Sequence, residues 1–137
     1  MFRKSLSVAL GLFLIIMGIR KLLGDMPIFE LIEIYTGLSF ADPYGRIITV
    51  AFEIFAGSLL IAGKRFEGGA LAMLILVIAL LFHLSVLGIH MPVSLAENAQ
   101  TSPLLFILAL TAFAIATLIT MEEYLDTHQG FMMIIAE

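Results

Sequence analysis

The chain has 137 residues, of which 61% are hydrophobic and only 13% are charged, and its mean hydropathy is +1.11. A soluble domain carries about a quarter charged residues, so the composition indicates one integral membrane domain over residues 1–137. The net charge of −4 excludes a basic surface for nucleic acid, and the absence of cysteine excludes disulfides and thiol redox chemistry. The apolar segments are continuous, not alternating, which argues against a β-barrel.

The first apolar segment, residues 6–23, is long enough to cross a bilayer as a helix of about 27 Å. It ends in Arg20 and Lys21. One face of this helix is expected to contact the bundle, with Lys21 at its far end; alternatively, both cations extend to the lipid headgroups. The residues that share this face are Gly11, Leu14, Gly18 and Lys21.

The connection between the first two spans, residues 24–45, begins with a helix breaker, Pro27, and ends in a turn signal at Asp42. Between them, apolar residues recur at helical spacing opposite Glu30 and Glu33. This pattern suits a short amphipathic helix at the membrane surface, capping the mouth of the bundle; an ordinary interfacial loop is the alternative. The apolar side of such a helix would comprise Ile28, Leu31, Ile32 and Tyr35.

The second span, residues 46–63, carries a carboxylate, Glu53, among apolar neighbours. A carboxylate is costly in lipid, so Glu53 is expected to face the protein interior, to pair with another group or to be protonated. Small residues share its helical face, which predicts close packing against another helix on that side. They are Thr49, Ala56 and Gly57.

A basic turn at residues 63–69 leads to the third span, residues 70–89, whose one ionisable residue within the apolar run is His83. After a polar loop, the fourth span covers residues 103–121 and has a face of small residues. The tail, residues 122–137, begins acidic and ends apolar; we expect a helical extension followed by a partner-dependent or frayed end. Beyond Glu123 the tail is expected to dock on a partner and not on its own bundle. The small-residue face comprises Ala109, Ala112, Ala116 and Thr120.

Four spans place both termini on the same side of the membrane. That side has four basic residues near the span ends and the other has three, a bias that predicts cytoplasmic termini. The four are Arg3, Lys4, Lys64 and Arg65, and the three are Arg20, Lys21 and Arg46. We expect the membrane to be a bacterial-type inner (plasma) membrane.

Polar residues on different spans fall at similar depths in this topology. From the outer ends of their spans, Glu53 lies about 10 Å inward, His83 about 9 Å and Thr111 about 12 Å, and the long side chain of Lys21 reaches in from the first span. Polar side chains that converge from several helices are typical of a site in a bundle core. The candidate ligand-binding pocket therefore comprises Lys21, Glu53, His83 and Thr111.

Each of these residues also has a purely structural explanation. Glu53 could form an ion pair with one of three cations, His83 could be a hydrogen-bonded core histidine, and Thr111 could bond back to its own helix. The cations within reach of Glu53 are Lys21, Arg20 and Arg46.

Several kinds of chemistry lack the residues that they need. A haem held by two histidines would need a second intramembrane histidine on another helix, and a metal at Glu53 and His83 would lack further ligands. No catalytic triad or phosphate loop is present, so the chain is underequipped as an enzyme on its own. We expect no metal and no tightly bound cofactor. A carboxylate and an imidazole in a pocket of low dielectric suit a quinone headgroup.

Three features carry a family resemblance: the glycine-spaced GLFLIIMGIRKLLG, the segment EIFAGSLLIAGKRFEGGALAML, and His83 in the third span. In these, over roughly residues 5–90, the chain resembles the DoxX-like family of small four-helix membrane proteins; its last helix, with ITMEEYLDTHQG, departs from the family's ending. The resemblance implies an all-α membrane four-helix bundle and association with oxidoreductases such as thiosulfate:quinone oxidoreductase. The positions that it carries over are Lys21, Glu53 and His83.

Two functions are compatible with these observations. One is an accessory subunit of a membrane oxidoreductase or electron-transfer complex that contacts quinone through the polar pocket. The other is a purely structural or assembly subunit of a larger membrane complex, with no site of its own. An open pocket around Glu53 and His83 would favour the first, and a filled core would favour the second.

Overall fold

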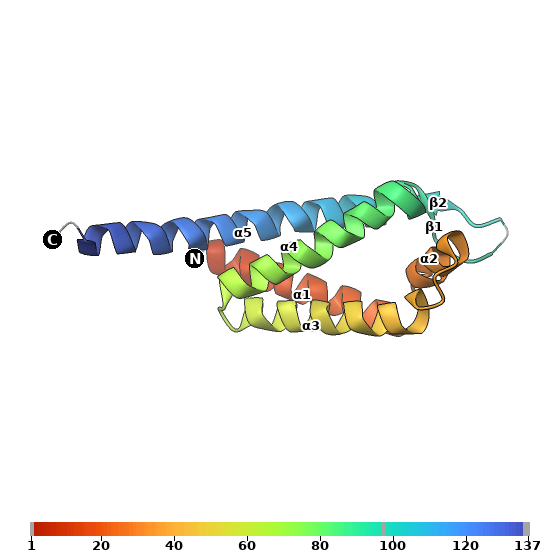
Figure 1. Ribbon diagram of the computed structural model, residues 1–137, viewed down its shortest axis with the longest axis horizontal. Helices are drawn as coiled ribbons and strands as arrows, with labels where there is room; N and C mark the ends of the chain where they lie inside the picture. Colours follow the sequence, from red (N-terminus) through yellow and green to blue (C-terminus); the bar gives the residue numbers. More distant parts are fainter. Residues whose placement is uncertain (1, 97, 136–137) are drawn as a thin grey trace.

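The computed structural model describes residues 2–96 and 98–135, with the side chains of residues 3–96 and 98–127. Within this part of the chain, four helices are long and apolar enough to cross a membrane, and they form one bundle (Figure 1). The all-α fold predicted from the sequence is confirmed, and the helices suit a membrane by their length and composition. They are α1 (Phe2–Leu22), α3 (Arg46–Ile61), α4 (Arg65–Phe82) and α5 (Leu104–Ile135).

Several helix boundaries differ from those of the expected spans. The first helix begins at Phe2 and not at residue 6, and α4 ends at Phe82 and not at residue 89. The turn after α3 is shorter than residues 63–69, because Gly63 takes a left-handed conformation (φ +84°) that ends the helix, and α4 begins at Arg65. The fourth helix does not end at residue 121 but continues to Ile135. The helical extension expected for the start of the tail is therefore present.

The connection between α1 and α3 forms a cap over one end of the bundle (Figure 1). It contains the expected amphipathic helix, α2 (Ile28–Thr36), and the short turn η1 (Ala41–Gly45). The buried side of α2 differs from the prediction, because Phe29 is buried and Tyr35 is 54% exposed. The cap is completed by the helical turn η2 (His83–Leu87) and by the strand pair β1 (Met91–Pro92) and β2 (Thr101–Ser102).

A small apolar cluster and an ion-pair network hold α2 in this position. Its apolar side packs on the loop after α4, and the Arg46 guanidinium at the start of α3 bonds to Glu30 on α2 and to Asp42 in η1. The Arg46–Asp42 distance is 2.7 Å. The apolar cluster comprises Leu31, Ile32, Ala41, Leu87 and Met91.

Glycines bring α1 and α3 into backbone contact, and Gly11 and Gly57 each lie on the face of their helix that was predicted to pack in the bundle. A Cβ built on Gly57 would lie 2.6 Å from the Gly11 carbonyl oxygen, and one built on Gly11 would lie 2.7 Å from that of Gly57. Such distances leave no room for any side chain. The close crossing fixes how far apart the side chains on the facing surfaces of α1 and α3 can lie.

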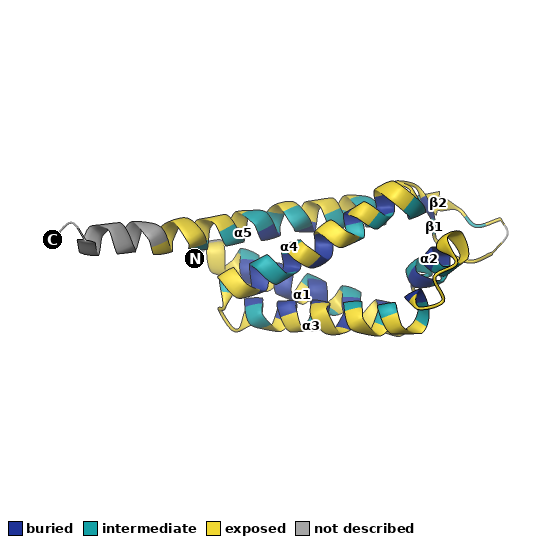
Figure 2. Ribbon diagram, in the orientation of Figure 1, coloured by how far each residue is buried: buried dark blue, intermediate teal, exposed yellow. Residues whose placement is uncertain are grey.

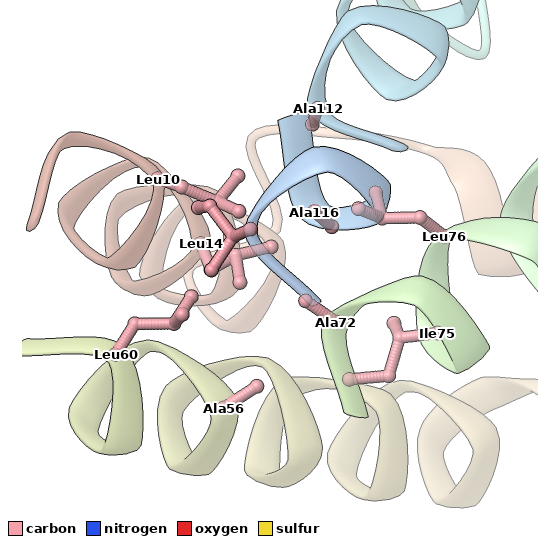
Figure 3. Close-up of a cluster of buried hydrophobic side chains, with 10 residues drawn as sticks. Leu10, Leu14, Ala56, Leu60, Ala72, Ile75, Leu76, Ala112 and Ala116 are labelled. Atoms are coloured by element: carbon pink, nitrogen blue, oxygen red, sulfur yellow. The ribbon is translucent and has the colours of Figure 1, made fainter. Parts of the chain in front are cut away.

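Small residues also join α4 to α5. A Cβ on Gly69 would collide with Thr120 Oγ1, so the small-residue face predicted for the fourth span is the one that contacts α4. Figure 2 shows that the buried residues lie on the parts of the helices turned toward one another, and exposed residues lie on the outside of the bundle. The main core cluster (Figure 3) comprises Leu10, Leu14, Ala56, Leu60, Ala72, Ile75, Leu76, Ala112, Ala116 and Ile119.

Ion pairs tie the α5 extension to the bundle. Arg3 on α1 contacts Asp126 at 2.5 Å and Glu122 at 3.3 Å, and Arg65 on α4 contacts Glu123 at 2.5 Å. The expectation that the tail beyond Glu123 does not contact its own bundle is therefore wrong at Asp126, whereas docking on a partner stays a prediction. The apolar end of the tail lies outside the described side chains.

Candidate functional site

A cavity of about 430 Å³ lies between α1, α3 and α4 and reaches the cap. Its volume is within the range of small-molecule sites in proteins. The lining is apolar apart from Thr49 and three ionisable side chains: Lys21 of α1, Glu53 of α3 and His83 of η2. Three of the four predicted site residues therefore meet in one cavity. Apolar lining residues include Phe13, Met17, Phe29, Phe52, Ile75 and Phe82.

Lys21 and Glu53 form a buried ion pair between α1 and α3. Lys21 is 8% exposed and Glu53 3%, and the Lys21 Nζ donates to Glu53 Oε1. Gly18, one turn before Lys21, lies beside the carboxylate: a Cβ there would be 3.5 Å from Glu53 Oε2, an ordinary van der Waals contact. Of the three cations considered as partners, the fold selects Lys21. Arg20 lies at the surface near Asp25, and Arg46 is engaged at the cap.

The second carboxylate oxygen of Glu53, Oε2, is buried and has no hydrogen-bond partner within the described part of the chain. A buried pair is stable only when its geometry and its remaining hydrogen bonds offset the loss of hydration. Here one oxygen is satisfied and the other lies against Gly18. The pair therefore keeps a charged group in the bundle at a cost to stability, as polar residues at binding sites commonly do.

His83 is held at the point where α4 passes into η2. Its Nδ1 lies 3.2 Å from the Gly88 carbonyl oxygen, and its ring meets the edge of Phe106 on α5, with centroids 5.8 Å apart and planes at 73°. Gly88 can serve as this anchor because it turns the chain at φ +78°. His83 is thus both a hydrogen-bonded core histidine and a wall of the cavity.

Thr111 does not belong to the cavity. It is exposed, and its Oγ1 donates to the Ile107 carbonyl oxygen of its own helix at 2.8 Å. The depth of Thr111 along α5 is no guide to its direction, since one residue turns a helix by about 100°. Ala112, the next residue, is the one that faces inward. The small-residue face predicted for the fourth span includes Ala112 and not Thr111, so the sequence had already indicated which side of this helix faces inward.

The cavity has an open side between α3 and α4. Four of its lining residues on these helices are 47% to 57% exposed, so they form a rim at the bundle surface. Both helices are long and apolar enough to cross a membrane, by their length and composition. The rim residues are Ile48, Phe52, Leu74 and Ile78.

Comparison of the chain with protein-family models, with curated proteins and with solved structures gives no match. The resemblance to the DoxX-like family therefore stays an expectation from the sequence. The cavity and the residues that line it are the observations from which a function can be inferred.

Proposed function

We propose that the chain is an accessory membrane subunit of an oxidoreductase or electron-transfer complex and that it binds a quinone in the cavity. One observation carries the proposal: the region around Glu53 and His83 is an open cavity with a single polar end, and not a filled core. An aromatic headgroup with polar oxygens and a long apolar tail matches such a cavity, in which a few polar groups fix orientation and the walls are apolar.

The lining residues suit each part of this ligand. The Lys21 ammonium has three N–H groups, of which one bonds to Glu53, so it can donate to a quinone oxygen. Phe13 and Phe82 offer aromatic surface to the ring. The rim between α3 and α4 allows the tail to remain in the lipid.

The accessory role is inferred from the sequence. The chain has no cysteine and no pair of intramembrane histidines suited to haem, so we assign electron transfer to a partner subunit. The resemblance to the DoxX-like family supports the same assignment. In this proposal the protein lies in a bacterial-type inner membrane with cytoplasmic termini and contacts other membrane subunits.

Filling the cavity tests the proposal. Ala79 lines the cavity, whereas Ala51 is exposed on the outside of α3, so Ala79→Phe and Ala51→Phe are matched variants. In lipid nanodiscs, calorimetric titration with decylubiquinone should give saturable binding to the wild type and to Ala51→Phe. Binding to Ala79→Phe should weaken at least about tenfold, because the added ring occupies the site. Absence of binding to the wild type would leave the purely structural subunit as the better description.

A further inference from the structure

His83 presents a hydrogen-bond acceptor to the cavity. Its Nδ1 lies 3.2 Å from the Gly88 carbonyl oxygen. A carbonyl oxygen can only accept, so Nδ1 must carry the hydrogen, and the Nε2 of a neutral imidazole is left with a lone pair. Within the described part of the chain Nε2 makes no hydrogen bond. Because Nδ1 bonds to the Gly88 carbonyl oxygen, a ligand that pairs with His83 must donate a hydrogen bond to Nε2.

Lys21 presents donors to the same cavity. Lys21 lines the cavity, and its ammonium donates one of its three N–H groups to Glu53 Oε1, which leaves two for a ligand. The polar end of the cavity thus combines a donor from α1 with an acceptor from η2. A ligand that satisfies both must carry a group that accepts and donates.

The two redox forms of a quinone differ in this respect. The oxygens of an oxidised quinone are acceptors only, so they can bond to Lys21 but leave His83 Nε2 unpaired in a site from which the ligand has removed water. A quinol carries hydroxyl groups, which accept from Lys21 and donate to Nε2. An unpaired buried polar group weakens binding by about tenfold or more.

We infer that the cavity selects the reduced quinol over the oxidised quinone, with His83 as the residue that discriminates. This inference rests on the proposed function and adds the redox form of the ligand. It makes the subunit a site where quinol is held beside the partner that exchanges electrons with the quinone pool.

The experiment compares two probes, decylubiquinol and decylubiquinone, titrated anaerobically into the full chain in nanodiscs, with empty nanodiscs as the blank. We expect the wild type to bind the quinol about tenfold more tightly. His83→Leu should lose this preference because its quinone affinity rises toward its quinol affinity, since the variant has no Nε2 for an oxidised quinone to leave unpaired. His83→Gln, which keeps an acceptor oxygen, should retain part of the preference, and His90→Leu, a change at an exposed loop histidine, should retain all of it.

The outcomes separate the two proposals. Equal affinity for both forms, or tighter binding of the quinone, overturns the quinol preference alone and leaves the quinone site in place. A preference that survives in a folded His83→Leu overturns the role of His83. Failure of either form to bind the wild type overturns the quinol preference and the proposed function together.

Discussion

Lys21 and Glu53 are largely shielded from water, and each charge depends on the other. Both are nearly fully buried, and their hydrogen bond crosses from α1 to α3. Removal of one partner from a buried pair leaves the other charge uncompensated, which is far more costly than removal of both. The stability of the bundle should therefore depend on the pair as a unit.

Glu53→Gln tests this dependence. We expect the free energy of unfolding in detergent to fall by about 3–5 kcal/mol, because the Lys21 ammonium loses its counter-charge. The double variant Glu53→Gln with Lys21→Met should recover much of the loss. Glu67→Gln, a change at an exposed carboxylate on α4, serves as the control and should alter stability by less than about 0.5 kcal/mol. A Glu53→Gln protein as stable as the wild type would mean that the pair does not support the fold.

At the scale of single residues, the sequence identifies the polar side chains within apolar helices more reliably than it predicts which way each side chain faces. A carboxylate in an apolar run has to face the protein interior, because a charged group in lipid is costly. The buried position of Glu53 could therefore be predicted from this cost alone. Its partner could not, since Lys21, Arg20 and Arg46 were all within reach. Thr111 shows the opposite case, because a hydroxyl can bond to its own helix at any depth and so carries little information about the core.

At the scale of the elements, two glycines set the geometry of the site. The backbone contact between Gly11 and Gly57 draws α1 onto α3, and two turns further along α1 the same face carries Gly18 and then Lys21. The pair that lines the cavity is thus a consequence of a close helix crossing. This could be predicted from the spacing of small residues. The exact ends of the helices could not be predicted. The two-residue turn Gly63–Lys64 is followed by further charged residues and glycines, which are equally typical of a longer loop.

Gly57→Ala tests the crossing. The added Cβ would lie 2.6 Å from the Gly11 carbonyl oxygen, so α1 and α3 must separate, and we expect a loss of about 1–3 kcal/mol in the free energy of unfolding. Gly45→Ala is the matched control, since Gly45 has helical dihedral angles and its Cβ would lie 3.5 Å from the nearest atom, an ordinary contact. Chemical unfolding of both variants would decide the matter. Equal stability of the two would show that the crossing tolerates a methyl group.

At the scale of the whole molecule, the cavity results from the way the bundle is closed at its two ends. Near the turn at Gly63, α3 and α4 touch through Gly68, whose Cβ would lie 2.9 Å from Leu60. Toward the cap the two helices diverge (Figure 1), and α2 covers the end of the space that they leave. Divergence of helices depends on crossing angles, which no local sequence pattern specifies. For this reason the polar residues of the site could be predicted, but the cavity and its open side could not.

We propose that a quinone occupies this cavity and not the outer surface of the bundle. Photolabelling of the protein in membranes with an azidoquinone, together with mass spectrometry of its peptides, tests that claim most directly. We expect the label on cavity-lining residues such as Phe13, Met17 and Phe82, and we expect an excess of decylubiquinol to suppress it. A label spread over exposed residues outside the cavity, such as Phe55 and Leu81, and insensitive to the competitor, would contradict the claim.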